Sequence, residues 1–121
     1  MARDPEKLQV FHHAHRLALE VYRLTEQLPA VERYGLTAQL RRSATSVPTN
    51  IVEGCRRQTS REYRRFIDVA LGSASEVGYL LGLAVDLAFL SAEDAAACRD
   101  CSNRVERELH NLLKAVAGFA P

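Results

Sequence analysis

One segment of the chain, residues 36–57, carries two stripes of different chemistry at the spacing of an α-helix. The first stripe is apolar and recurs at steps of three or four residues, which is the pattern of one helix face: Leu36, Leu40, Ala44, Val47 and Ile51. The second stripe recurs at the same steps but is polar: Gln39, Arg42, Ser46, Asn50, Glu53 and Arg57. At about 100° per residue, the two stripes lie roughly 130° apart around the helix axis. The segment is therefore predicted to be a helix that meets two different partners.

The polar stripe differs from an ordinary solvated helix face. Such a face carries long charged side chains, whereas Ser46 and Asn50 are short groups that suit a specific hydrogen-bond network. Three explanations fit: a network between helices of one subunit, an interface between subunits, or contact with a ligand. The interface is slightly favoured, because a second buried face is more than a single bundle needs. The residues assigned to this interface or network are Gln39, Arg42, Ser46, Asn50 and Glu53.

Three other segments repeat apolar residues at helical spacing, and no segment alternates as a β-strand does. The predicted helices cover about residues 7–28, 60–89 and 92–118. Their starts have typical capping residues: Asp4 before Pro5, Thr59 three residues before Glu62, and Ser91 before Glu93 and Asp94. Gly118 is expected to end the last helix.

Four helices joined by short connectors predict an all-α fold, an antiparallel up-down four-helix bundle that forms one domain over residues 1–121. Pro48 lies inside the second helix and removes one backbone donor, so a kink is expected near residues 44–48. The third helix contains a run of small residues at 72–75. This run is expected to let another backbone approach closely.

The composition is that of an ordinary globular chain, with 47% apolar and 26% charged residues in 121. No uninterrupted apolar run approaches the roughly 20 residues of a membrane span, and the first residues lack the hydrophobic region of a signal peptide. The three cysteines are an odd number, which fits reduced thiols. The sequence therefore predicts a cytoplasmic protein without a membrane partner.

Positive charge is concentrated in residues 41–65, although the whole chain has a net charge of only +1. This segment has two glutamates and seven arginines, Arg41, Arg42, Arg56, Arg57, Arg61, Arg64 and Arg65, for a local net charge of +5. Arginine is suited to planar, two-point contact with phosphate or carboxylate. Two interpretations are equally supported: a nucleic-acid-binding patch, or a solvated corner between two helices with internal salt bridges.

No group of residues has the pattern of a catalytic, cofactor or metal site. Cys98 and Cys101 form a single CxxC pair without a second pair, and both fall on the apolar face of their helix, so they are interpreted as core residues. His12 and His15 share one side of a helix but lack further ligands nearby. Glu53 and Glu62 lie among arginines and are interpreted as salt-bridge partners. The sequence therefore predicts a protein that is not an enzyme and binds no cofactor or metal.

Residues 34–54, YGLTAQLRRSATSVPTNIVEG, resemble the signature of a bacterial four-helix-bundle family named after proteins encoded in intervening sequences of 23S ribosomal RNA. Residues 61–66 and 70–76 also match, and the likeness covers roughly residues 8–118. The resemblance implies a single-domain antiparallel bundle that assembles as a ring-like homopentamer and has no established enzymatic activity. A related branch serves retroelements as an accessory subunit that contacts reverse transcriptase and nucleic acid.

Two classes of function follow for this chain. The first is a non-catalytic homo-oligomer whose arginines contact RNA or DNA. The second is an interaction scaffold, or an accessory subunit of a protein such as a reverse transcriptase, whose arginines pair with acidic residues of other subunits. Salt-dependent RNA binding distinguishes them, because contact with phosphates gives a steep dependence on salt.

Overall fold

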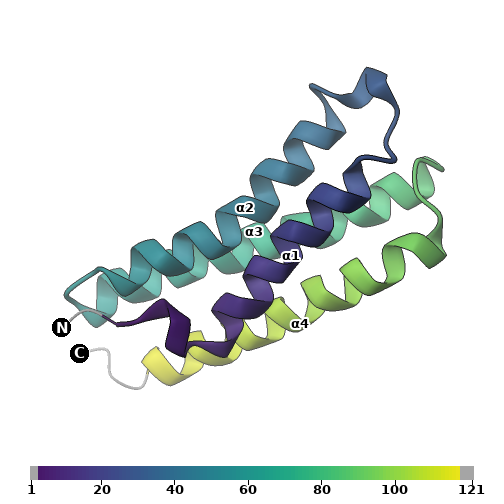
Figure 1. Cartoon of the computed structure of the whole chain (residues 1–121). Helices are drawn as coiled ribbons and strands as arrows, with labels where there is room; N and C mark the ends of the chain where they lie inside the picture. The colour runs from purple at the N-terminus through teal and green to yellow at the C-terminus, as the bar shows by residue number, and fades with distance from the viewer. Residues whose placement is uncertain (1–2, 118–121) are drawn as a thin grey trace.

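The computed structural model describes residues 3–117, and in that part of the chain all regular structure is helical (Figure 1). The elements are the 3₁₀ turn η1 (Pro5–Lys7), α1 (Gln9–Thr25), the 3₁₀ turn η2 (Ala30–Glu32), α2 (Leu36–Cys55), α3 (Ser60–Asp86) and α4 (Ala92–Ala117). The predicted all-α fold of four long helices is therefore confirmed.

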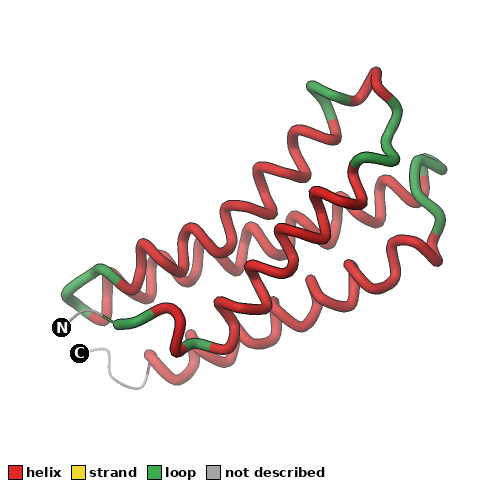
Figure 2. The backbone as a smooth tube through the Cα atoms, in the orientation of Figure 1, coloured by secondary structure: helices red, strands yellow, loops and turns green. Residues whose placement is uncertain are grey.

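Each long helix packs against two others: α1 with α2 and α4, and α3 with α2 and α4. Figure 1 shows the chain running out along α1, back along α2, out along α3 and back along α4. The connectors therefore lie at the two ends of the bundle, where Figure 2 shows them as loops. The α1–α2 and α3–α4 connectors share one end, and the α2–α3 connector lies at the other.

The helix starts follow the capping residues. The amide of Glu62 donates to Thr59 Oγ1 at 3.1 Å, and the amide of Asp94 donates to Ser91 Oγ at 3.0 Å. Asp4 also caps a helical turn, but that turn is η1, and α1 begins only at Gln9 after an extended Leu8. The predicted first helix was therefore too long at its start.

The ends of α1, α2 and α3 lie two or three residues before their predicted positions. α1 ends at Thr25 and α2 at Cys55, and both continue briefly as turns. α3 ends at Asp86, three residues before its predicted end, because Ala88 has a left-handed backbone with φ of 62°. The amides of Phe89 and Leu90 then both donate to the carbonyl of Ala84. An αL end without glycine or asparagine has no local sequence signal. The predicted end of α4 at Gly118 lies outside the described residues.

α2 is a continuous helix through Pro48. A proline at this position leaves the carbonyl four residues earlier, on Ala44, without its helical donor. A kink at residues 44–48 remains a prediction. Next to this position Thr45 Oγ1 donates to the Arg41 carbonyl at 2.9 Å, so the helix surface here has side-chain as well as backbone hydrogen bonds.

The core is formed by one face of each helix. Its largest completely buried side chains include Leu17 of α1, Leu40 and Ile51 of α2, Tyr63, Ile67 and Leu81 of α3, and Leu109 of α4. Cys98 is buried with them, as predicted, whereas Cys101 is half-buried. Removing apolar surface from water stabilises the folded chain by roughly 25 cal/mol per Å² and is the main term that stabilises such a bundle.

The small residues 72–75 of α3 contact their neighbours unevenly. Gly72 has open space beside it, whereas the Ala74 carbonyl accepts a hydrogen bond of 3.1 Å from the buried Ser102 Oγ of α4. Ser102 also lies close to Gly78, where an added Cβ would come within 3.4 Å of its hydroxyl. The contacts of Ser102 with α3 therefore begin within the predicted run, at Ala74, and extend beyond it to Gly78.

By length and composition alone, α3 is long and apolar enough to cross a membrane, and it is the only such helix in residues 3–117. α3 meets this criterion through its mean hydropathy, since polar and charged residues interrupt its apolar ones and no uninterrupted apolar run reaches that length. Core helices of bundles pass the same test, and α3 packs against both α2 and α4. Only 33% of its most apolar window is buried within the subunit. α3 therefore presents apolar side chains outside the core.

Candidate functional site

Part of the polar stripe of α2 lies against α3 of the same subunit. Ser46 Oγ and Ser73 Oγ are 2.8 Å apart, and Asn50 Nδ2 donates to the Ser46 carbonyl at 2.8 Å and to Ser46 Oγ at 2.9 Å. About two turns before Ser46, Gln39 Nε2 donates to Glu76 Oε2 at 3.2 Å. Gln39 and Ser46 therefore make polar contacts across the α2–α3 interface, and Asn50 supports Ser46 from within α2.

The other members of the stripe have different surroundings. Arg42 is exposed and belongs to none of these contacts. Glu53 lies 3.7 Å from Arg57 Nη2, and both side chains are 40–50% exposed. An exposed i,i+4 pair of this kind is worth at most a few tenths of a kcal/mol. The stripe is thus divided into an α3-facing group and an exposed group, and participation of Arg42 and Glu53 in a subunit interface remains a prediction.

Replacing Asn50 by alanine is expected to lower the free energy of unfolding by about 1 kcal/mol, which is the usual net value of such hydrogen bonds. The loss of stability is not larger than this, because the Ser46 hydroxyl keeps its hydrogen bond with Ser73 in the variant. Urea unfolding measures the change, and Thr49→Ala is the matched control because Thr49 is exposed on the same helix. Equal stability of both variants would place Asn50 among ordinary surface residues.

Five arginines flank the turn between α2 and α3, and we call them the arginine corner: Arg56, Arg57, Arg61, Arg64 and Arg65. The turn is fixed by the Thr59 cap, which starts α3 four residues after α2 ends. Four of the five are exposed and form no ion pair with any described residue. The corner therefore has unneutralised guanidinium groups directed at solvent.

Arg57 is the exception within the corner. Its guanidinium lies over the Phe66 ring, 4.6 Å from the centroid, and it also pairs with Glu53. Its Nε is buried without a hydrogen-bond partner. Arg57 therefore contributes to packing at the end of the α2–α3 pair as well as to charge, which is partly the structural role that the sequence left open for these arginines.

The structure separates Arg41 and Arg42 from the corner. Fifteen residues of helix lie between Arg41 and Arg56, a distance of about 22 Å along the axis. Arg41 Nε donates to Thr25 Oγ1 at 2.9 Å, and its guanidinium lies 4.6 Å from the centre of the Tyr22 ring. Arg41 therefore ties α2 to α1. The arginines that are close in sequence do not form one surface.

Arg3 joins the corner, and sequence reasoning did not include it. Its backbone amide donates to the Cys55 carbonyl at 2.9 Å, and its guanidinium lies 3.8 Å from the centre of the Tyr63 ring. It also lines a groove of about 560 Å³ together with Lys7, Ser60 and Leu112. The contact joins residues sixty positions apart, so no local pattern could have indicated it.

The histidines and cysteines do not come together. His12 Nε2 lies 2.7 Å from the Glu6 carbonyl, His13 Nδ1 lies 2.7 Å from Glu108 Oε1, and His15 is exposed. Within residues 3–117 no three histidine, cysteine or acidic side chains are arranged to hold a metal ion. Burial, with a contribution from the Glu20 carboxylate, raises the pKa of the Cys98 thiol to about 12, so this thiol is protonated and a poor nucleophile at neutral pH.

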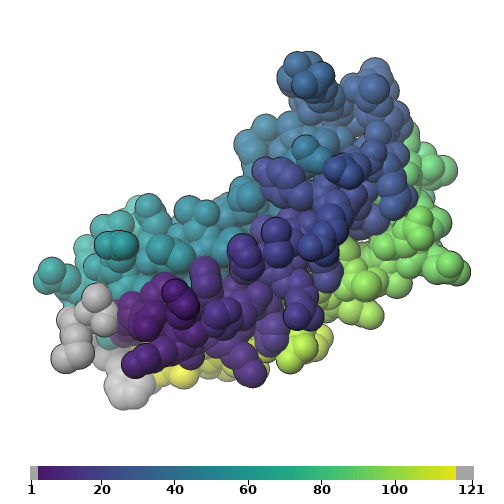
Figure 3. Space-filling view, viewed as in Figure 1, coloured from purple at the N-terminus to yellow at the C-terminus, as the bar shows by residue number. Residues whose placement is uncertain are grey.

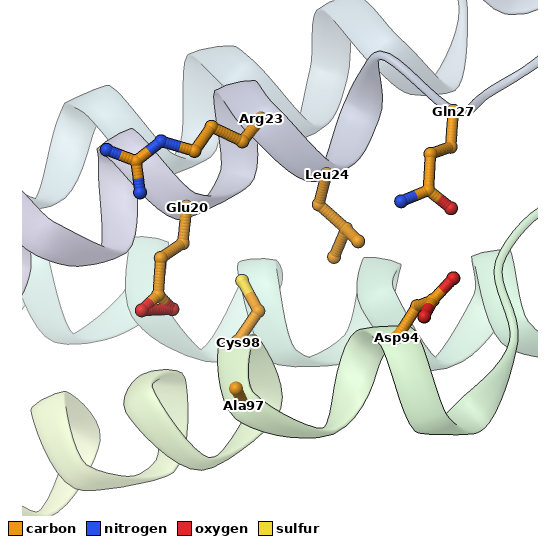
Figure 4. A pocket seen from close by; sticks show the side chains of 7 residues that line it. All are labelled: Glu20, Arg23, Leu24, Gln27, Asp94, Ala97 and Cys98. Carbon is orange, nitrogen blue, oxygen red and sulfur yellow. The ribbon is translucent and has the colours of Figure 1, made fainter.

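A pocket of about 210 Å³ lies between α1 and α4 (Figure 4). We call it the α1–α4 pocket. Figure 4 shows the residues that line it: Glu20, Arg23, Leu24, Gln27, Asp94, Ala97 and Cys98. The Glu20 side chain extends from α1 toward α4, and its Oε2 atom is buried without a hydrogen-bond partner. The polar stripe and the arginines did not indicate this pocket, because Glu20 has no unusual neighbours in sequence.

Comparison with known proteins agrees with the sequence signature. A family model described as 23S rRNA-intervening sequence protein matches residues 6–111. A crystal structure of a protein of unknown function, from the S23 ribosomal protein family of Bacteroides thetaiotaomicron, is similar with a TM-score of 0.80. It shares 23% sequence identity, and the match covers 87% of this chain and 98% of that one. At this identity the likeness shows the fold alone. No curated protein matches the chain.

Proposed function

Because this chain belongs to the family of 23S rRNA-intervening sequence proteins, we propose that it is a non-catalytic, self-associating bundle whose arginine corner contacts the phosphates of RNA or DNA. The observation that carries this proposal is the exposure of Arg56, Arg61, Arg64 and Arg65 at one end of the bundle without acidic partners in residues 3–117. Side chains of this kind supply sequence-independent binding by releasing counterions from the polyanion.

The surface of α3 supports self-association. Val69 and Tyr79 are 48% and 69% exposed, and Leu87, just after the helix, is 50% exposed. Apolar and aromatic side chains are enriched at the centres of protein interfaces. We propose a homopentamer, the state that the family resemblance implies, with α2 and α3 contributing contacts. A cyclic assembly would repeat the arginine corner around one rim, which strengthens its attraction for a polyanion.

The direct test replaces Arg61, Arg64 and Arg65 together by glutamine and leaves the packed Arg57 intact. We expect at least a tenfold loss of affinity for single-stranded RNA at low salt, and a decrease of about 2 in the slope of log affinity against log salt. Fluorescence anisotropy measures both quantities. The matched control removes three exposed arginines outside the corner, Arg16, Arg99 and Arg107, and is expected to bind almost as the wild type does.

The scaffold is the second candidate, and one observation favours it. Arg41 and Arg57 both have intramolecular partners, so arginines of the 41–65 segment already serve structural roles. A scaffold whose corner arginines pair with acidic residues of other subunits would lose assembly in the triple variant and would show no RNA binding in the wild type. Light scattering alongside the anisotropy measurement therefore distinguishes the two functions.

A further inference from the structure

The connector between α1 and α2 carries the most exposed large apolar side chains of the described chain. Val31 and Tyr34 are each 86% exposed, and Figure 3 shows this connector projecting beyond the helices. Arg33 lies between them, and its guanidinium is 5.6 Å from the centre of the Tyr34 ring. We call these three residues the connector knob. Tyrosine and arginine are the residue types that most often dominate binding energy at interfaces.

The backbone that carries the connector knob is ordered by hydrogen bonds within the connector. Glu32 Oε1 accepts from the Leu36 amide at 3.0 Å, and the Glu32 carbonyl accepts from the Gly35 amide at 2.9 Å. An added Cβ on Gly35 would lie 2.8 Å from Glu32 Oε1 and would shift this carboxylate away from the Leu36 amide. A projecting group that is already ordered loses little conformational entropy on binding. The connector is therefore suited to insertion into a partner.

The α1–α4 pocket has the complementary features. Its apolar surface comes from Leu24, Ala97 and Cys98. At about 210 Å³ it exceeds the roughly 150 Å³ cavity that suffices for a benzene ring. Two carboxylate side chains, Glu20 and Asp94, supply hydrogen-bond acceptors to the same lining. The pocket thus fits an aromatic ring that carries a hydrogen-bond donor.

We propose that the connector knob of one subunit docks in the α1–α4 pocket of a second copy, with the Tyr34 ring against the apolar part of the pocket lining. The pocket lining has two acidic residues, Glu20 and Asp94, and one basic residue, Arg23, so its net negative charge is complementary to Arg33 of the knob. This inference rests on the proposed self-association and specifies one of its contacts. The knob cannot fill the pocket of its own subunit, since Tyr34 is 86% exposed there.

The positions of the two surfaces fit a ring. The knob and the pocket lie at the same end of the bundle, because the pocket is formed by the last turns of α1 and the first turns of α4 (Figure 1). They are different surfaces, so the contact is head-to-tail and generates a ring when the rotation closes. Subunits joined in this way can lie parallel. The arginine corners, which lie at the opposite end of the bundle, would then share one rim.

Two variants test the contact from its two sides. Tyr34→Ala removes the knob, and Ala97→Phe fills the pocket from an exposed position on α4. We expect each to raise the concentration at which the assembly dissociates by at least tenfold, as measured by light scattering and analytical ultracentrifugation. Glu20→Gln is a second pocket variant of similar volume and is expected to weaken assembly in the same direction. Leu19→Ala is the control, because Leu19 is 44% exposed on α1 but belongs to neither surface.

A mixture of the two variants tests the head-to-tail geometry. The Ala97→Phe chain keeps its knob and the Tyr34→Ala chain keeps its pocket, so native mass spectrometry should detect a one-to-one heterodimer that neither variant forms alone. Absence of that heterodimer would overturn the inference. An assembled wild type whose dissociation is unchanged in all three variants would also overturn it and leave self-association intact. A monomeric wild type would instead overturn the proposed self-association itself.

Discussion

Replacing Tyr63 by alanine is expected to lower the free energy of unfolding by about 3–5 kcal/mol, the range for truncating a large aromatic side chain in a core. Tyr63 is 1% exposed and is among the largest completely buried side chains. It packs where α2 and α3 meet, since an added Cβ on Gly54 would lie 3.4 Å from its Cδ1. The variant would therefore leave a cavity at the base of the arginine corner and remove the ring on which Arg3 lies.

Urea unfolding followed by circular dichroism measures this loss, and Tyr63→Phe is the matched control. Phenylalanine keeps the ring and its contact with Arg3, so we expect a change below about 1.5 kcal/mol. The alanine variant should also bind RNA more weakly, because Arg3 and the start of α3 lose their support. A Tyr63→Ala protein as stable as the wild type would show that this end of the bundle is not packed as described.

The protein is expected to lose stability steeply above pH 9. Burial raises the pKa of the Cys98 thiol from its ordinary value of 9.0 to about 12. Below pH 9 the thiol is protonated in both the folded and the unfolded chain, so the full contribution of Cys98 to the free energy of unfolding is present. Between pH 9 and 12 the unfolded chain releases the proton and the folded chain keeps it, which costs about 1.4 kcal/mol per pH unit. By pH 11 the loss from this group is about 2–3 kcal/mol.

Other groups act in the same direction. Burial also raises the pKa values of Cys55, Cys101 and Tyr63, so each opposes folding as it ionises in the unfolded chain. Urea midpoints measured from pH 7 to 11 test the expectation. Cys98→Ala is the control, because its packing defect is the same at every pH and only the titration is removed. From pH 7 to 11 the free energy of unfolding of this variant should fall by about 2 kcal/mol less than that of the wild type. If it falls equally in both proteins, the Cys98 thiol does not have the raised pKa that its burial implies.

Periodicity in the sequence was sufficient to predict the four helices, because one face of each supplies the core. The apolar stripe Leu40, Ala44, Val47 and Ile51 is completely buried. Helix ends were less predictable where tertiary structure determines them. Ala88 adopts a left-handed backbone that alanine does not favour, so the end of α3 follows from the packing of Leu90 and its neighbours against the core rather than from a local signal.

The candidate site was less predictable, because its residues are brought together from distant positions. The arginine corner was visible as a cluster in sequence, but Arg41 contacts α1 and Arg3 enters from the N-terminal segment. The polar stripe was recognised by its short side chains, and its contacts with Ser73 and Glu76 on α3 correspond to one of the three explanations left open. The pocket at Glu20 required the α1–α4 packing, which spans about seventy positions of sequence.

The most direct test of the account is the affinity of the wild-type protein for a labelled single-stranded RNA as salt rises from about 50 to 200 mM. Four exposed, unpaired arginines per subunit predict a log–log slope of roughly −3 for each subunit in contact with the strand, and a slope reduced to about −1 in the Arg61, Arg64 and Arg65 triple variant, which keeps Arg56. Absence of binding at the lowest salt, or affinity independent of salt and of the triple substitution, would contradict the proposed nucleic-acid interface.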